Sequence, residues 1–160
     1  MFIRPFARRD QSCLIELTIE TFWPFFEDSF RPLVGDALFT LQHGNWRDDY
    51  RKQVAELHNP HRHKYVAVAE IDGAIAGYVG WSVDPARRHG TIAILTIATE
   101  HRRAHAGTAL CRHAFDEMRS LGAEMVEIGT GGDTFHAPAR ALYESLGCIQ
   151  VPAAVYFRRL

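Results

Sequence analysis

Three apolar runs of strand length occupy the middle of the chain. Residues 65–71 (YVAVAEI) and 74–83 (AIAGYVGWSV) are joined by Asp72-Gly73, a dipeptide typical of two-residue β-hairpin turns. A third run at 90–99 is rich in β-branched residues and follows a polar loop. The pattern predicts an antiparallel meander of three strands.

The part of the chain before the meander has a different pattern. Residues 2–6 are short and apolar enough for a first strand. Leu14 and Leu17 then follow helical spacing, and Pro24 is expected to kink or end that helix. A second helical stretch, with breaks, is expected from about 36 to 57.

After the meander the apolar spacing is that of a helix. Leu110, Ala114, Met118 and Leu121 form one stripe, and Gly122 is placed to end the helix that begins at Gly107. A strand at 123–128 follows this crossover helix and should therefore run parallel to the strand before it.

The last part of the chain predicts one more helix and the edge of the sheet. A helix from about 138 to 146 is expected to end at Gly147, and residues 149–159 are expected to supply one or two closing strands. We therefore expect a single α/β (α+β) domain, residues 1–160. A central twisted mixed sheet, antiparallel in its first part, should carry helices on both faces.

Composition excludes several classes of protein. A formal net charge of −1 gives no global field that would recruit nucleic acid, and no apolar run is long enough to span a membrane. The three cysteines are odd in number and far apart, which indicates a reducing, cytoplasmic location. The tight histidine pairs, His61 with His63 and His101 with His105, lack the further ligands of a metal site, so no metal is expected.

The segment from Gly90 to Leu121 carries the clearest chemistry. An apolar strand ends at a basic loop containing Arg102 and Arg103, and a helix begins at Gly107. Free backbone N–H groups and the positive end of a helix favour anions, and arginine adds charge-assisted hydrogen bonds. The segment therefore predicts a site for a phosphate-containing ligand, although a solvated basic turn would have the same sequence.

Two motifs, in this order of elements, resemble the GNAT superfamily of acetyl-CoA-dependent N-acetyltransferases. The first family motif is a strand, then Arg/Gln-x-x-Gly-x-Gly/Ala, then a helix, and residues 102–107 read RRAHAG. The second is Asn-x-x-Ala-x-x-Leu-Tyr-x-x-Leu-Gly-Phe, and residues 136–148 read HAPARALYESLGC. The sequence departs from the motifs at His105, where glycine is expected, at His136, where asparagine is expected, and at Cys148, where an aromatic residue is expected.

The resemblance implies that acetyl-CoA is the co-substrate and that the first motif holds its pyrophosphate. It also implies that the strand before the motif is splayed from its neighbour, so that backbone groups pair with the pantetheine arm. The implied cofactor-binding residues are Ile97, Ala98, Thr99, Arg102, Arg103, Ala104, His105, Ala106, Gly107, Thr108, Ala109, His136, Ala139 and Tyr143.

The resemblance also implies how the acetyl group moves. An amine attacks the thioester directly in a ternary complex, and a backbone N–H at Ile97 or Ala98 stabilises the oxyanion. Tyr143 protonates the departing thiolate, although a core tyrosine with a satisfied hydroxyl is the plainer interpretation of that residue. His136 either contacts the pantetheine or caps the helix.

The acceptor side is less clearly marked. An aromatic and acidic stretch after the first helix suits a cationic amine, so Trp23, Phe26 and Glu27, together with Trp81 on the hairpin, are the expected acceptor-binding residues. Core packing explains the same aromatics equally well. No general base is assigned, because Glu70, Glu100 and Glu127 are as well explained as surface carboxylates.

Two other functions stay open at this point. A non-catalytic acyl-CoA-binding or regulatory module is supported by His105 in the phosphate loop, and a protein-interaction domain would have no CoA site. The acceptor of an active enzyme would be a small-molecule or peptide amine, with neither nucleic acid nor membrane as partner. A homodimer is possible, because C-terminal strands of this fold often pair.

Overall fold

A computed structural model describes all residues, 1–160, and contains one five-stranded sheet. The strands lie in the order of the chain: β1 (Phe2–Pro5), β2 (Lys64–Ile71), β3 (Ala74–Asp84), β4 (His89–Ile97) and β5 (Met125–Ile128). β1 to β4 pair antiparallel and β4 pairs parallel with β5. The mixed sheet with an antiparallel first part is therefore confirmed.

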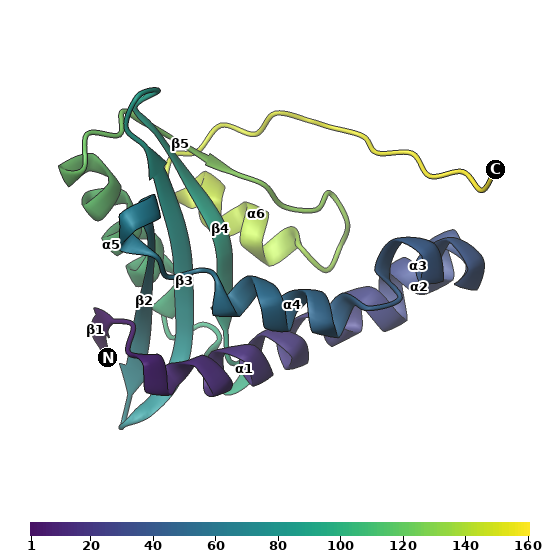
Figure 1. Ribbon diagram of the computed structural model, residues 1–160, viewed down its shortest axis with the longest axis horizontal. Helices are drawn as coiled ribbons and strands as arrows, with labels where there is room; N and C mark the ends of the chain where they lie inside the picture. Colours follow the sequence, from purple (N-terminus) through teal and green to yellow (C-terminus); the bar gives the residue numbers. More distant parts are fainter.

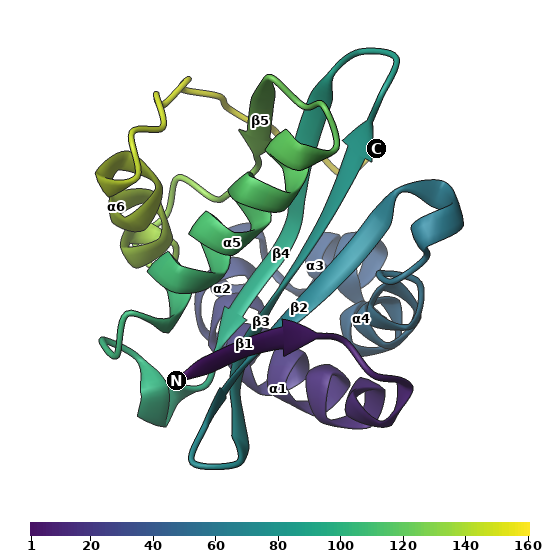
Figure 2. The ribbon, with the colours of Figure 1, turned by 90° about the vertical axis from the view of Figure 1, so that its left-hand side faces the viewer.

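Helices cover both faces of this sheet, as the sequence predicts. Figure 2 shows α5 (Ala106–Ser120) across one face, with α1 (Gln11–Pro24) and α4 (Trp46–Ala55) on the other. The remaining helical elements are η1 (Arg8–Asp10), η2 (Phe25–Phe30), α2 (Arg31–Val34), α3 (Asp36–His43), η3 (Pro60–Arg62), η4 (Thr99–His101) and α6 (Ala137–Ser145). None of the helices combines the length and the apolar character that crossing a bilayer requires.

Alternation along the strands produces two hydrophobic cores. Val66 and Val68 of β2 face α1 and α4, whereas Ala67 and Ala69 between them face α5. Successive strand side chains point to opposite faces, so a strand buried on both sides reads as a continuous apolar run. This explains why β2 and β3 lack a polar face in the sequence.

The prediction of an apolar stripe on α5 is confirmed for three of its four residues. Leu110, Ala114 and Met118 are buried against the sheet. Leu121 is 40% exposed, because the helix ends at Ser120 and the chain turns away through Gly122 at φ +90°. Leu121, the last residue of the predicted stripe, is therefore the C-cap of the helix and not part of the core.

Pro24 changes the first helix without ending the helical path. The α-helix stops at Pro24, and residues 25–30 continue as the π-helix η2 before α2 begins at Arg31. A π-helix closes i→i+5 hydrogen bonds, so its side chains leave the 3.6-residue spacing. The faces on which Phe25, Phe26 and Glu27 lie are consequently not those of a regular helix.

The predicted closing strands at residues 149–159 are wrong. The chain has no regular secondary structure after Gly147, and Figure 1 shows this segment leaving the sheet and running towards the end that carries α2 and α3. Its side chains are largely exposed, although Phe157 reaches the ring of Phe30. Pro152 removes a backbone donor from the middle of the segment, which opposes pairing with β5.

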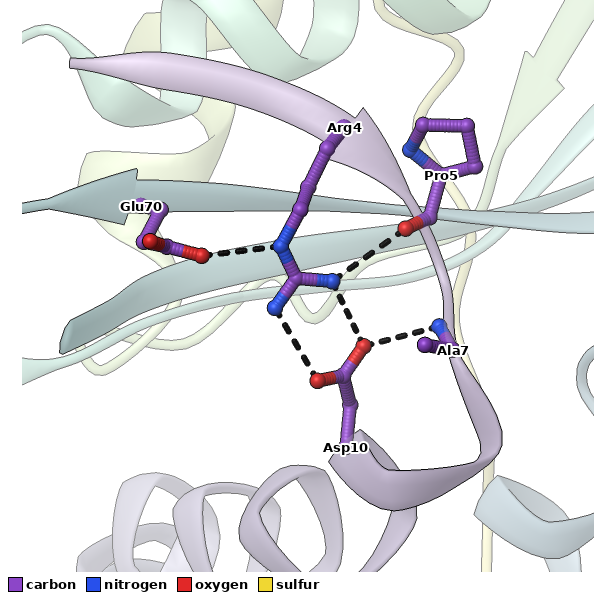
Figure 3. A network of polar contacts seen from close by, with 5 residues as sticks. All are labelled: Arg4, Pro5, Ala7, Asp10 and Glu70. Carbon is purple, nitrogen blue, oxygen red and sulfur yellow. Dashed lines mark hydrogen bonds and ion pairs between the residues drawn. The ribbon is translucent and has the colours of Figure 1, made fainter. Parts of the chain in front are cut away.

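A partly buried ion-pair network fixes the junction of β1 with α1 (Figure 3). The Arg4 guanidinium donates to both carboxylate oxygens of Asp10, at 2.7 and 3.0 Å, and its Nε donates to Glu70 of β2 at 2.8 Å. Asp10 also accepts the N–H of Ala7 and is only 4% exposed. The hydrogen bonds from Arg4 hold the pKa of the Asp10 carboxyl below its ordinary value.

Arg4→Ala is expected to lower the free energy of unfolding by about 3 kcal/mol, because it leaves the Asp10 carboxylate buried without its partner. Urea denaturation at pH 7 measures the change. Arg8→Ala is the control, since Arg8 is exposed and is not part of the network, and its effect should stay within about 0.5 kcal/mol.

Acid should reduce the difference between wild type and Arg4→Ala. The folded pKa of Asp10 lies below its unfolded value, so the network stabilises the fold above the unfolded pKa of about 3.9. The stability is lost as pH falls through the folded pKa. A difference that persisted undiminished at pH 2 would show that lost packing of the Arg4 stem, not the ion pair, stabilises this junction.

Candidate active site

β4 and β5 part after a short ladder. Their parallel pairing runs from His89 opposite Met125 to Ile92 opposite Ile128 and stops there. β4 continues to Ile97, whereas the chain leaves β5 through a glycine-containing loop. Residues 93–97 of β4 therefore have no strand neighbour on the side away from β3.

The direction of the N–H groups along β4 follows from one hydrogen bond. The Ala98 N–H donates to the Ala76 carbonyl at 2.9 Å. Pairing alternates in an antiparallel ladder, so the N–H groups of Ile97 and Leu95 point the other way, into the opening beyond Ile92. The prediction that Ala98 offers an oxyanion donor is thus corrected, because its amide is already bonded. Ile97 keeps that capacity, and Leu95 is an amide that the sequence did not single out.

The loop that follows β4 bends twice through left-handed backbone. Arg103 has φ +67° and His105 has φ +59°. His105 thus adopts the conformation for which the motif calls for glycine, and histidine is among the residues that tolerate it best. His105 therefore occupies backbone that glycine would also adopt, and its side chain lies exposed at the surface.

The loop and the first turn of α5 present backbone donors without acceptors. No side chain caps the start of α5. The first hydrogen bond at this end of the helix is donated by the Ala109 N–H to the His105 carbonyl. No hydrogen bond engages the N–H groups of Arg103, His105, Ala106, Gly107 and Thr108. Clustered free donors at a helix start are a binding site for an anion such as a pyrophosphate.

A pocket of about 790 Å³ joins the open edge of β4, this loop and α6. It collects most of the predicted cofactor-binding residues: Ile97, Arg102, Arg103, His105, Ala106, Gly107, Thr108, His136, Ala139 and Tyr143. The remaining predicted residues do not line it: Ala98, Thr99, Ala104 and Ala109.

Tyr143 lies on α6 with its side chain almost fully buried, at 9% exposure. Its hydroxyl forms no hydrogen bond within the protein, although the residue lines the pocket. Burial raises the pKa of the phenol above its ordinary value, with Cys111 and Cys148 contributing. The hydroxyl is therefore protonated at neutral pH and can donate to a group in the pocket.

Aromatic rings form part of the pocket wall. Phe22 of α1 stacks on Tyr50 of α4 with ring centroids 5.2 Å apart, and Phe135 lies 6.2 Å from Phe22. All three residues line the pocket, together with Thr21 and Gln53. The sequence did not predict this wall, because Phe135 lies in a loop and the direction of the Phe22 side chain depends on how α1 packs against α4.

The residues predicted to bind the acceptor do not line this pocket. Phe26 is buried between Phe39 and Trp46, and Trp81 lies in the core beneath α5. Trp23 is 43% exposed and does not line the pocket. Glu27 is taken up by other groups: it accepts from the Trp46 indole and pairs with Arg31 and Arg47, so it offers no free charge to a cation.

The carboxylates considered as bases also lie outside this pocket. Glu70 bonds to Arg4, Glu100 is exposed, and Glu127 is exposed beside His89. No three His, Cys, Asp or Glu side chains gather closely enough to hold a metal ion. A base must therefore come from another residue or from water.

A larger hollow of about 1140 Å³ lies between α5, β5, α6 and the C-terminal segment. Tyr143 borders it as well, but it contains none of the free N–H groups of the α5 start and no part of β4. The chemistry is therefore concentrated in the smaller pocket.

Comparison with protein families decides the class. The model of the acetyltransferase (GNAT) family matches residues 18–148, most of the chain. The chain belongs to the GNAT family of acetyltransferases. Its reaction class is therefore acyl transfer. A search of the curated proteins finds no match.

Solved structures of other proteins share this GNAT fold at low identity. A variant of the BH1408 protein from Bacillus halodurans has a TM-score of 0.75 at 16% identity, with both chains fully covered. AAC(6′)-Iy, in complex with the bisubstrate analogue CoA-S-monomethyl-acetylneamine, has a TM-score of 0.68 at 13% identity, covering 99% of this chain and 97% of that one. A ribosomal-protein-alanine N-acetyltransferase from Brucella melitensis biovar Abortus 2308 has a TM-score of 0.65 at 15% identity, with both chains fully covered.

Proposed function

We propose that this GNAT protein transfers an acetyl group from acetyl-CoA to a primary amine, which attacks the thioester directly in a ternary complex. One observation carries the proposal. A single pocket contains the free amides of the α5 start, the unpaired edge of β4 and the Tyr143 hydroxyl. These are the groups that an anionic, extended thioester and its leaving group require.

The residues present fit acetyl-CoA by the nature of their donors. The free N–H groups at 103 and 105–108 would receive the pyrophosphate, with Arg102 and Arg103 adding positive charge. The unpaired stretch of β4 would pair with the amides of the pantetheine arm as an added strand does. Backbone donors at this position need no particular side chain, so His105 does not exclude the ligand.

The acetyl group would lie within reach of the remaining groups. The amides of Ile97 and Leu95 face the opening and would polarise the thioester carbonyl. Tyr143 would protonate the thiolate, because burial keeps its phenol in the protonated form at neutral pH. The aromatic wall of Phe22, Tyr50 and Phe135 would receive the ammonium group of the acceptor.

We place this activity in one domain, residues 1–160. A cytoplasmic location is supported by the three free cysteines. The acceptor class is a small-molecule or peptide amine, because the aromatic wall is open to a cationic group without specifying what carries it.

Two measurements test the proposal. The first is isothermal titration with acetyl-CoA. The second is an assay of thiol release with four amines: spermidine, kanamycin, lysine and a peptide with an N-terminal alanine. Arg102→Ala is expected to weaken acetyl-CoA binding about tenfold, which corresponds to about 1.4 kcal/mol. Arg102 suits this test because its backbone is extended at φ −63°, which alanine adopts without strain.

Arg119→Ala is the matched control. Arg119 lies near the other end of α5, is exposed, and pairs only with Asp116, so binding should not change. If Arg102→Ala binds acetyl-CoA as tightly as the wild type, the phosphates do not bind at this loop. Acetyl-CoA binding without turnover of any amine would favour a non-catalytic acyl-CoA-binding module, and absence of binding would exclude both functions.

A further inference from the structure

His136 and Asp133 form a close pair at the start of α6. His136 Nδ1 lies 2.7 Å from Asp133 Oδ2, and the His136 N–H donates to Asp133 Oδ1 at 3.2 Å. Both side chains are half-buried or more, and His136 lines the pocket that contains Tyr143. A histidine held by a carboxylate and facing a pocket can accept a proton there.

The pair defines which ring nitrogen is available. Partial burial by itself would raise the pKa of Asp133, but the hydrogen bonds from His136 outweigh it and the pKa lies below its ordinary value. An ionised carboxylate only accepts, so Nδ1 must carry the hydrogen of this bond. In the neutral ring Nε2 then has the free lone pair.

The loop that carries Asp133 is built around the pair. A Cβ at Gly131 would overlap both Asp133 Oδ2 and His136 Nδ1, so only glycine leaves room for their contact. Arg140 of α6 donates to the Gly131 and Asp133 carbonyls and fixes the loop against the helix. Gly131 and Arg140 therefore both help to keep the Asp133 carboxylate in contact with His136 Nδ1.

The surroundings of His136 suit an acceptor amine. Phe22 and Phe25 lie 6.5 and 4.8 Å from its ring, and Phe135 packs beside it at 4.9 Å. Phe22 and Phe135 belong to the aromatic wall of the pocket. His136 is the N-cap of α6 and precedes Tyr143 by seven positions, about two helical turns, so the two residues are about 10 Å apart along the helix axis and near the same side of it.

We propose that His136 is the general base of the acetyl transfer, with Asp133 as the positioning residue that directs its Nε2 towards the amine. The proposal rests on the function proposed above and adds to it the residue that activates the acceptor. It also narrows the acceptor to an amine that is protonated in solution, since only such an amine must lose a proton before its nitrogen can attack.

The protons of the reaction balance in this scheme. His136 Nε2 takes one proton from the ammonium, directly or through water, and later passes it to solvent. The amine lone pair forms the C–N bond, the C–S bond breaks, and Tyr143 protonates the thiolate. The second proton leaves the nitrogen as the amide forms and replaces the one that Tyr143 donated. The products are an amide, a thiol and one released proton.

The first test needs no acceptor. Nitrogen-15 NMR of the histidine rings in the protein alone, with His136→Gln to assign the signal, reports which nitrogen carries the hydrogen. The expected result is a protonated Nδ1 and an unprotonated Nε2 in the neutral ring, and a shift towards the other tautomer in Asp133→Asn. A wild-type ring protonated at Nε2 overturns the proposal.

The second test is kinetic and uses two acceptors. His136→Gln is expected to lower kcat about 100-fold with the best aliphatic amine of the panel. With O-benzylhydroxylamine, which is uncharged at neutral pH, the loss should be within about threefold, because no proton has to be removed first. The glutamine amide can still donate to Asp133, and Asp133 still accepts the backbone N–H, so the helix start is kept.

Controls separate a base from a structural role. His61→Gln replaces an exposed histidine outside the pocket and should leave kcat unchanged. Asp133→Asn should lower kcat more than it raises KM for the amine. Equal losses with both acceptors in His136→Gln, or no loss with the aliphatic amine, overturn the proposal. If the wild type binds acetyl-CoA and acetylates nothing, the proposed function fails, and the tautomer measurement still decides whether His136 presents a free nitrogen.

Discussion

Gly77→Ala is expected to lower stability and acetyl transfer together. A Cβ at Gly77 would lie 2.5 Å from the backbone oxygen of Thr96 and 2.6 Å from Ile97 Cδ1, so β4 must move away from β3. Overpacking of this kind lowers the free energy of unfolding by about 2 kcal/mol. Gly77 stands opposite Ile97, whose amide is a proposed oxyanion donor, and losing one such donor lowers kcat about 100-fold.

Thermal unfolding and steady-state kinetics measure the two effects. Gly132→Ala is the matched control, because a Cβ there meets no atom within 4 Å and the backbone is not left-handed. Its unfolding temperature and kcat should equal those of the wild type. A Gly77→Ala protein that lost stability but kept kcat would show that the position of Ile97 does not matter to the reaction.

Tyr143→Phe is expected to lower kcat by a factor of about 30 and to leave acetyl-CoA binding unchanged. The hydroxyl makes no hydrogen bond within the protein, so its removal breaks no structural contact. General acid catalysis contributes about 100-fold or more, and a thiolate is a good enough leaving group to place the effect below that range.

The control for Tyr143→Phe is Tyr65→Phe. Tyr65 is half-buried against Trp81, away from the pocket, so kcat should not change. Unfolding temperatures of both variants should match the wild type within about 2 °C, which corresponds to less than about 1 kcal/mol. An unchanged kcat in Tyr143→Phe would leave protonation of the thiolate to water and reduce Tyr143 to a packing residue.

The sheet could be predicted because its signals are local. β2, β3 and β4 are separate apolar runs, Asp72-Gly73 marks the hairpin, and the crossover helix α5 requires β5 to be parallel. The closing strands were predicted wrongly because the segment has no such local signal. The apolar content of residues 149–159 resembles that of a strand, but nothing in the segment itself specifies a partner, and Pro152 interrupts its donors.

The free amides that we propose to hold the cofactor could also be located from the sequence, because they depend on backbone groups at fixed offsets. A loop and a helix start after β4 determine where the free N–H groups lie, whichever side chains are present. Ala98 could not be distinguished from Ile97, since the direction of an amide depends on the ladder register. The bond from Ala98 to Ala76 determines that register.

The proposed acceptor side depends on contacts between distant segments. Glu27 appears free in the sequence, but Trp46 and Arg47, from another helix, engage it. The π-helix moves Phe26 into the core while Phe22 reaches the pocket, and no helical spacing predicts that division. Asp133 did carry a signal: aspartate is common in turns, where its carboxylate accepts nearby backbone N–H groups, and the same geometry places it on the imidazole.

The four-residue ladder between β4 and β5 has a consequence for local unfolding. β5 lies at the edge of the sheet with a single strand neighbour, and α6 follows it through an irregular loop. Detaching this segment breaks a shorter ladder than opening β2, β3 or β4, so we expect it to open at a lower free energy than those strands. His136 and Tyr143 lie on the detachable side, and the amides of β4 and α5 on the anchored side. A ligand that contacts both sides stabilises the closed form by an amount that grows with the logarithm of its concentration above Kd, and its departure lowers the free energy needed to open the segment again.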